Sequence, residues 1–145
     1  MKRRFQSGFT LLETVMVCVL AVVILSIAVP NIQQSLHFYR LTASANLVAG
    51  ELNAGRAMAI SRNWIYEVSL DTSNSTIQII DPTDPNNSPR TEKPLESGTS
   101  FSSVPANRIR FYSRGHALGG TIVLENQSGY SISITVSSSG RIATS

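Results

Sequence analysis

Residues 8–30 read GFTLLETVMVCVLAVVILSIAVP, a short polar start followed by an apolar run that ends at a proline. As a helix rising about 1.5 Å per residue, residues 9–29 extend about 30 Å, which matches the hydrocarbon core of a bilayer. The stretch therefore predicts a membrane-spanning helix. Basic residues precede it at Lys2, Arg3 and Arg4, and such residues stay in the cytoplasm, so we expect the rest of the chain on the other side.

Two plainer interpretations of this stretch compete with an assembly helix. One is a secretory signal peptide with Ser26-Ile27-Ala28 as its small-x-small cleavage site, and the other is a simple membrane anchor. Glu13 argues against both, because a carboxylate at the centre of a membrane helix costs about 2.5–3.5 kcal/mol and is usually kept for pairing or function. No basic residue lies within the run, so its cation must come from another chain or from a new amino terminus.

The segment from Gly8 to Glu13, with the apolar helix and Pro30 after it, resembles the class III signal of type IV pilins and pseudopilins. The resemblance implies that a prepilin peptidase cuts between Gly8 and Phe9 and N-methylates Phe9. It also implies that Glu13 pairs with the terminal amine of a neighbouring subunit during filament assembly. Coulomb's law in a medium dielectric gives an attraction of a few kcal/mol between the Glu13 carboxylate and such an amine at close range. This attraction favours assembly over storage of the subunit in the bilayer.

The same resemblance divides the chain into three parts. Residues 1–8 are expected to be a cleaved leader peptide, residues 9–30 the transmembrane and assembly helix, and residues 31–145 a periplasmic pilin-like domain. We expect the proline at position 30 to kink the helix at the membrane surface or to break it there, because proline removes a backbone hydrogen bond. The subunit is thus expected in the inner membrane of a prokaryote, with its amino terminus cytoplasmic, and later in a pilus or pseudopilus.

The helical pattern continues beyond the proline to about residue 62 but becomes amphipathic. Two adjoining stripes predict a broad apolar face that packs on a sheet. One stripe consists of Leu41, Ala45, Val48 and Leu52, and the other of Ile32, Leu36, Tyr39, Ala43 and Leu47.

The remainder alternates between apolar and polar residues and predicts an antiparallel sheet with one wet face. Residues 64–70 form a half-buried strand in which Trp64, Tyr66, Val68 and Leu70 share a face, and residues 76–80 form its hairpin partner. The proline-rich residues 81–107 predict a long surface loop. Residues 108–112 form a strand with Ile109 and Phe111 on one face, and residues 121–124 and 130–136 form a second hairpin.

The expected fold class is therefore α+β, a long amino-terminal helix packed on an antiparallel β domain. The segment LVAGELNAGRAMAISRN at residues 47–63 and the ending VSSSGRI at residues 136–142 resemble the GspH/FimT group of minor pilins. The resemblance covers nearly the whole chain. It implies a minor pilin that is incorporated into a type IV pilus or initiates it, or alternatively a minor pseudopilin of a type II secretion system, with other pilins and the prepilin peptidase as partners.

Cysteine and motif content give no support for an enzyme. Cys18 has no intramolecular partner, His37 and His116 are far apart, and no nucleophile elbow or phosphate loop is present. We therefore expect no catalysis, no cofactor and no metal.

Charge is unevenly distributed along the domain. Residues 31–96 hold five basic and seven acidic residues, whereas residues 97–145 hold four basic residues and one acidic residue. Some FimT-like pilins bind DNA through a carboxyl-terminal Gly-Arg-x-Arg motif, and here Gly140-Arg141-Ile142 matches but Ala143 replaces the second arginine. This resemblance makes DNA a possible partner, with contacts from the basic residues Arg108, Arg110, Arg114 and Arg141.

Overall fold

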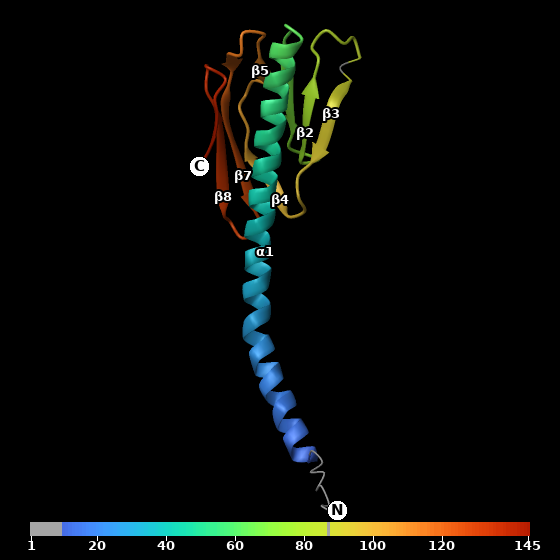
Figure 1. Cartoon of the computed structure of the whole chain (residues 1–145), viewed down its shortest axis with the longest axis vertical. Coiled ribbons are helices and arrows are strands. Elements are labelled where there is room, and N and C mark those ends of the chain that lie inside the picture. Colours follow the sequence, from blue (N-terminus) through green and yellow to red (C-terminus); the bar gives the residue numbers. More distant parts are fainter. Residues whose placement is uncertain (1–9, 87) are drawn as a thin grey trace, which may run out of the picture. The chain divides into compact units, whose positions relative to one another are not determined.

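The structure is a computed structural model that describes residues 10–86 and 88–145. Within these residues, one long helix, α1 (Leu11–Ser61), is followed by nine short strands (Figure 1). The chain divides into two compact units, the first ending at Ser35 and the second running from Leu36 to Ser145. The α+β fold expected from the sequence, a long apolar helix followed by an antiparallel β domain, is confirmed.

Local capping residues fix both ends of α1. At its start, the backbone N–H of Glu13 donates to Thr10 Oγ1 at 3.2 Å, so the Thr10-x-x-Glu13 spacing provides an amino-terminal cap. At its end, Asn63 adopts a left-handed conformation with φ of 50°. The N–H of Trp64 then donates back to the carbonyl of Ala59 at 3.0 Å, which closes the last turn. The predicted helix end near residue 62 is confirmed.

The first unit contains the part of α1 that is long and apolar enough to cross a membrane. Its most apolar 18-residue window has a mean hydropathy of 2.7, and none of that window is buried. Large apolar side chains are exposed throughout it, from Leu11 to Val29. Such a surface is stable only when lipid or other protein covers it, since apolar area in water is unfavourable by roughly 25 cal/mol per Å².

The second unit contains two antiparallel sheets. The first has five strands in the order β3-β2-β1-β5-β6, and the second has four in the order β4-β7-β8-β9. The strands are β1 (Tyr66–Asp71), β2 (Thr76–Ile80), β3 (Pro89–Pro94), β4 (Thr99–Ser103), β5 (Ile109–Phe111), β6 (Ala117–Leu118), β7 (Gly120–Asn126), β8 (Ser131–Val136) and β9 (Ile142–Thr144).

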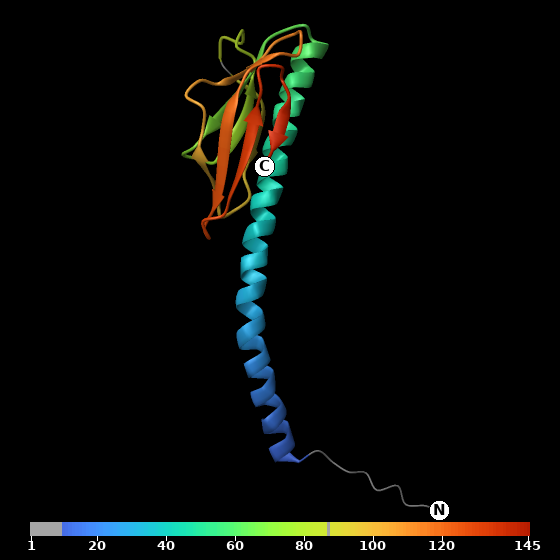
Figure 2. The same ribbon diagram turned by 90° about the vertical axis from the view of Figure 1, so that its left-hand side faces the viewer.

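The core of this unit lies between the strands and the part of α1 that begins at Leu36. Leu41, Val48 and Leu52 are completely buried, and Ala45 nearly so, so one of the two predicted apolar stripes forms the helix side of the core. Figure 2 shows this part of α1 lying along one face of the strand layer. The strands contribute the facing side chains, which include Tyr66, Val68, Ile77, Ile79, Ile109, Phe111, Ile122, Leu124 and Ile134.

Strand register explains which residues reach the core. Tyr66 pairs with Phe111 and Val68 with Ile109 between β1 and β5, so the four side chains meet on the inner face. The predicted orientation of residues 108–112 is confirmed. The predicted hairpin at the end of the chain is also confirmed, since β7 pairs with β8 from Gly120↔Val136 to Glu125↔Ser131.

The predicted long surface loop over residues 81–107 is wrong. This segment contains two strands, β3 and β4, and buries Leu95 and Phe101. Proline was misleading because Pro89 and Pro94 occupy the two ends of β3, which lies at the edge of its sheet. An edge strand has one side without hydrogen-bond partners, so a missing N–H is tolerated there.

Between β2 and β3, Asp81 organises the intervening turn. Its carboxylate accepts hydrogen bonds from the side chain and backbone of Thr83, and these bonds hold the pKa of Asp81 below its ordinary value.

Three smaller predictions need correction. A kink or a break was predicted at position 30, and the break is wrong, because α1 continues through it and the loss of one backbone hydrogen bond does not end a helix this long. Trp64 was predicted to lie in the first strand, but it is half-exposed and precedes β1, because the turn that caps α1 at Asn63 includes its backbone N–H. In the second apolar stripe, Ile32, Leu36 and Tyr39 are exposed, so the buried face of the helix is narrower than predicted.

We predict that Phe111→Ala lowers the free energy of unfolding by about 3–5 kcal/mol, because Phe111 is fully buried and its removal leaves a cavity. Urea unfolding of the protein in detergent micelles, followed by circular dichroism of the strands, measures the change. Tyr39→Ala is the control, because Tyr39 is exposed and its loss is expected to change stability by less than about 0.5 kcal/mol. Equal effects of the two substitutions would contradict the core described above.

Candidate functional site

The predicted assembly residue Glu13 lies in the first turn of α1 and its side chain is exposed. A carboxylate there is favoured by the partial positive charge of the helix amino terminus. No salt bridge within residues 10–86 and 88–145 involves Glu13. The predicted cleavage residues Gly8 and Phe9 lie outside the described residues.

A second group of sequence-predicted residues, Arg108 and Arg110, is tied to the buried carboxylate of Glu67. Arg110 Nε donates to Glu67 Oε1 at 2.8 Å and its Nη2 makes a second contact with the same oxygen, while Arg108 Nη1 lies 3.4 Å from Oε2. Hydrogen bonding to Glu67 raises the pKa of Arg110 above its ordinary value. Two of the four predicted DNA-binding arginines therefore share one carboxylate, which reduces the positive charge they present.

The other two predicted arginines, Arg114 and Arg141, are exposed and lie on adjacent turns. The β5–β6 turn and the β8–β9 turn meet where the N–H of Ala117 donates to the carbonyl of Ser138 at 3.0 Å. At the same junction Arg56 of α1 donates from Nε to the carbonyl of Gly115 at 3.1 Å. We call Arg56, Arg114 and Arg141 the arginine cluster. None of the three forms a salt bridge within the part of the chain that the structure describes.

Glycine makes this junction possible. Gly115 and Gly140 have φ of 84° and 77°, in the left-handed region that favours glycine. A Cβ on Gly140 would lie 2.0 Å from the carbonyl oxygen of Gly115 and 2.9 Å from Arg56 Nε. The contact that holds the two turns and Arg56 together therefore requires a glycine at position 140.

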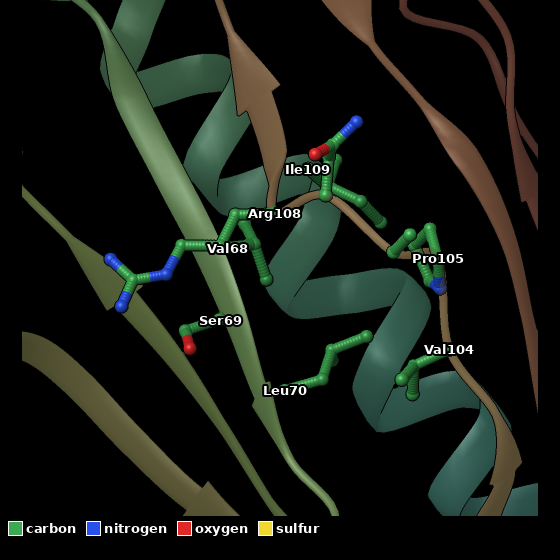
Figure 3. Close-up of a pocket in the computed structure, with 9 residues that line it drawn as sticks. Val68, Ser69, Leu70, Val104, Pro105, Arg108 and Ile109 are labelled. Carbon is green, nitrogen blue, oxygen red and sulfur yellow. The ribbon is translucent and has the colours of Figure 1, made fainter.

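A pocket of about 260 Å³ lies between β1 and the segment leading into β5 (Figure 3). Its lining is mixed, with the apolar residues Val68, Leu70, Val104, Pro105 and Ile109 beside the polar residues Ser69, Asn107 and Arg108. Figure 3 shows the guanidinium of Arg108 extending across β1, and its partner is Glu67. Within the described residues, no group of three or more His, Cys, Asp or Glu side chains is placed to hold a metal ion.

Known proteins resemble this chain both in sequence pattern and in fold. The sequence pattern of the family described as type II transport protein GspH matches residues 44–140. The chain belongs to the GspH family. No curated protein has a sequence that matches the chain significantly.

Solved structures of this fold include pilins from two kinds of machine. The minor pseudopilin EpsH from the type II secretion system of Vibrio cholerae has a TM-score of 0.61 at 14% identity, over 73% of this chain and 96% of EpsH. The type IV minor pilin FimU of Pseudomonas aeruginosa has a TM-score of 0.58 at 16% identity, over 72% of this chain and 87% of FimU. The GspH/FimT resemblance of the sequence is thereby confirmed, and the protein is a pilin-like subunit of the minor pilin or pseudopilin type.

Sequence reasoning missed the residues that anchor the charges of this GspH-family domain. Glu51, buried on α1, accepts a hydrogen bond from Thr91 at 2.8 Å and pairs with Lys93 at 2.6 Å, which fixes edge strand β3 to the helix. Glu67 belongs to no motif, and Arg56 lies in the segment at residues 47–63 that resembles the GspH/FimT group, but no role was assigned to it. Glu51 gave the one available signal. An acidic residue among apolar neighbours on a buried helix face predicts a cation beside it, because a buried charge is unfavourable unless it is paired.

We predict that Gly140→Ala destabilises the protein more than Gly129→Ala does. Both glycines have positive φ, so each substitution is expected to lose about 1–2 kcal/mol from the left-handed conformation alone. A Cβ at Gly129 meets nothing within 4 Å, whereas one at Gly140 collides with the Gly115 carbonyl. Urea unfolding of both variants measures the difference, and equal losses would show that the turns do not meet as described.

Proposed function

We propose that the protein is a minor pilin of a type IV pilus system, made as a prepilin, processed between Gly8 and Phe9, and incorporated into the filament or required to initiate it. The GspH-family match over residues 44–140 supports a pilin-type subunit of either a type IV pilus or a type II secretion system, and the choice of the pilus rests on residues 28–32. The exposed apolar surface of α1 supports it, since such a helix is stored in a membrane and then packed against neighbouring helices. The subunit carries no catalysis of its own and acts by assembling.

Glu13 supplies the electrostatic step of this assembly. Cleavage before Phe9 creates a positively charged amino terminus, and a carboxylate four residues later attracts the amine of an adjacent subunit. The surroundings are apolar, so an unpaired Glu13 carboxylate is unfavourable and the pair is formed preferentially. Thr10 contributes by capping the helix so that Glu13 is held in its first turn.

The alternative within the same family is a minor pseudopilin of a type II secretion system, for which the fold of EpsH gives equal support. The sequence Ala28-Val29-Pro30-Asn31-Ile32 after the apolar run resembles the FimT side of the group and favours the pilus. The two machines differ in their products, surface fibres in one case and secreted proteins in the other. Loss of the subunit therefore distinguishes them.

We predict that deletion of the gene in its bacterium reduces surface pili and leaves protein secretion intact, and that Glu13→Ala fails to restore pili. Glu13→Asp, which keeps the charge, is expected to restore them in part. The number of sheared pili, secreted protein and the mass of the mature subunit are measured together. The expected mature chain begins with N-methylated Phe9 in the wild type and in both variants.

Other outcomes would overturn specific parts of the proposal. Loss of secretion with normal pili would assign the subunit to a type II system instead. A chain that begins at Val29 would identify a signal peptide, and a chain that still begins at Met1 would identify a plain anchor. Full assembly of Glu13→Ala would exclude the proposed ion pair.

A second candidate function is DNA binding during uptake by the pilus. The arginine cluster favours it, because Arg56, Arg114 and Arg141 come from three separate segments to one junction and have no carboxylate partner within the described residues. Phosphate groups are the partners that such arginines bind without sequence preference. Arg108 and Arg110 contribute less because Glu67 binds both.

If three phosphates are contacted, the logarithm of the DNA affinity is expected to fall with the logarithm of salt concentration with a slope of about −2.7. Arg114→Gln with Arg141→Gln is expected to reduce the slope to about −0.9. The control, Arg40→Gln with Arg90→Gln, removes the same charge elsewhere. Fluorescence anisotropy with a labelled duplex measures all three proteins, and identical slopes would exclude the arginine cluster as a DNA site.

A further inference from the structure

Strand β1 has a sheet neighbour along only part of one of its sides. Its pairing with β2 extends to Asp71↔Thr76, whereas its pairing with β5 ends at Val68↔Ile109. The last three residues of β1 therefore have a strand partner on one side alone. Because β1 lies in the middle of the five-stranded sheet, this open stretch is an edge inside the sheet.

The hydrogen bonds of the neighbouring strands show which backbone groups of β1 face the open side. The N–H of Tyr112 donates to the carbonyl of His116, just before β6, at 3.0 Å. Backbone groups alternate in direction along a strand, so Ile109 points toward β1 and forms a hydrogen-bonded pair with Val68. Leu70, two residues beyond Val68, points to the same side. Within residues 10–86 and 88–145, its N–H and C=O have no hydrogen-bond partner.

Leu70 lines the pocket between β1 and the segment that leads into β5. The volume of this pocket, about 260 Å³, is below the roughly 300–1,000 Å³ of typical small-molecule sites. Figure 3 shows the side chains of Leu70 and Val104 pointing toward one another across it, in front of α1. Both side chains are half-buried. The pocket therefore combines apolar side chains with an unpaired backbone donor and an unpaired backbone acceptor.

The opposite wall of the pocket begins at a second open strand edge. Val104 directly follows β4, which is an edge strand of the four-stranded sheet. The N–H of Asn126 donates to the carbonyl of Tyr130 at 3.0 Å, so the backbone groups of Asn126 and Leu124 point toward β8. Phe101 of β4 lies opposite Leu124 and therefore points away from β7. In the described part of the chain, no backbone hydrogen bond satisfies Phe101 on that edge.

An extended peptide is the occupant that matches both kinds of group. Water satisfies the N–H and the C=O but leaves the apolar side chains wet, and an apolar molecule leaves the two polar groups unpaired. A strand laid against Leu70 supplies a carbonyl and an N–H from a single residue, as in recognition by an added strand. The side chain of that residue lies on the same face as the side chain of Leu70, so we expect it to be apolar.

We propose that the open edge at Leu70 receives an extended segment of a neighbouring subunit, which adds a strand beside the last residues of β1. The inference rests on the proposed function only for the source of this segment, and it holds for a pilin and a pseudopilin alike. The β domain then makes a contact of its own during assembly, in addition to the contacts of α1.

The test measures amide hydrogen exchange of the full chain in detergent micelles by nuclear magnetic resonance. The probe is the peptide acetyl-Ser-Thr-Val-Thr-Ser-amide, whose valine takes the position opposite Leu70. The matched control is the same peptide with an N-methyl group on that valine, which removes the N–H and keeps the side chain. Without peptide, the N–H of Leu70 is expected to exchange faster than the N–H of Val68, which is bonded to β5.

The probe is expected to slow exchange at Leu70 about tenfold when its concentration is about ten times its Kd, because protection grows with the ratio of ligand to Kd. The N-methyl peptide is expected to have no effect. Val104→Asp charges the apolar wall and is expected to abolish the slowing, whereas Ser103→Asp, outside the pocket lining, is expected to keep it. Circular dichroism checks that both variants are folded.

Two results would overturn the added strand. One is equal exchange at Leu70 and Val68 without peptide, since the edge would then already be paired. The other is exchange at Leu70 that the probe does not slow up to its solubility limit, or that both peptides slow equally. The measurement needs no filament, so a failure of the proposed function leaves its outcome unchanged.

A photoreactive amino acid in place of Ala106, which is exposed at the pocket, tests the source of the segment in assembled filaments. Mass spectrometry of the cross-linked peptides is expected to find a segment of another pilin in which apolar and polar residues alternate. Cross-links that reach only a helix of the neighbouring subunit, or only proteins that are not pilins, would overturn this source.

Discussion

The structure depends on one helix whose apolar surface has to be covered in two different ways. Before Ser35 the apolar side chains of α1 are exposed throughout, and after Leu36 only the stripe that includes Leu41, Val48 and Leu52 is apolar and buried. The strands cover that stripe with apolar side chains from both sheets. The first part has no such cover and therefore depends on lipid or on other subunits.

Buried carboxylates hold the β domain to this helix and within itself. Glu51 binds Lys93 and Thr91 of edge strand β3, and Glu67 binds the two arginines next to and on β5. Edge strand β3 has a sheet neighbour on one side only, so the charge-assisted link to Glu51 gives it a second attachment. The consequence for function is a division among the arginines. Those bound to a carboxylate stabilise the sheet, and those of the arginine cluster are available to a partner.

The same physical logic connects storage and assembly of the subunit. In the bilayer, the apolar helix is satisfied by lipid while Glu13 has no cation within the described residues. In the proposed filament, neighbouring helices replace lipid and a terminal amine meets Glu13. Assembly is then an exchange of partners along the apolar part of α1 and at Glu13.

The sequence by itself determined the elements whose signals are local. An apolar run with one carboxylate predicts the spanning helix, and strict alternation predicts β5 and the β7–β8 hairpin, because these patterns depend on neighbours in sequence. Tertiary structure decided the rest. Strand β3 forms despite Pro89 and Pro94 because a sheet edge tolerates them. Glu67 binds Arg108 and Arg110, two of the four arginines predicted to contact DNA. Arg56 lies at the junction of the turns that carry Arg114 and Arg141 because two glycine turns meet there. Such contacts join residues distant in sequence, and only the folded chain brings them within hydrogen-bonding distance.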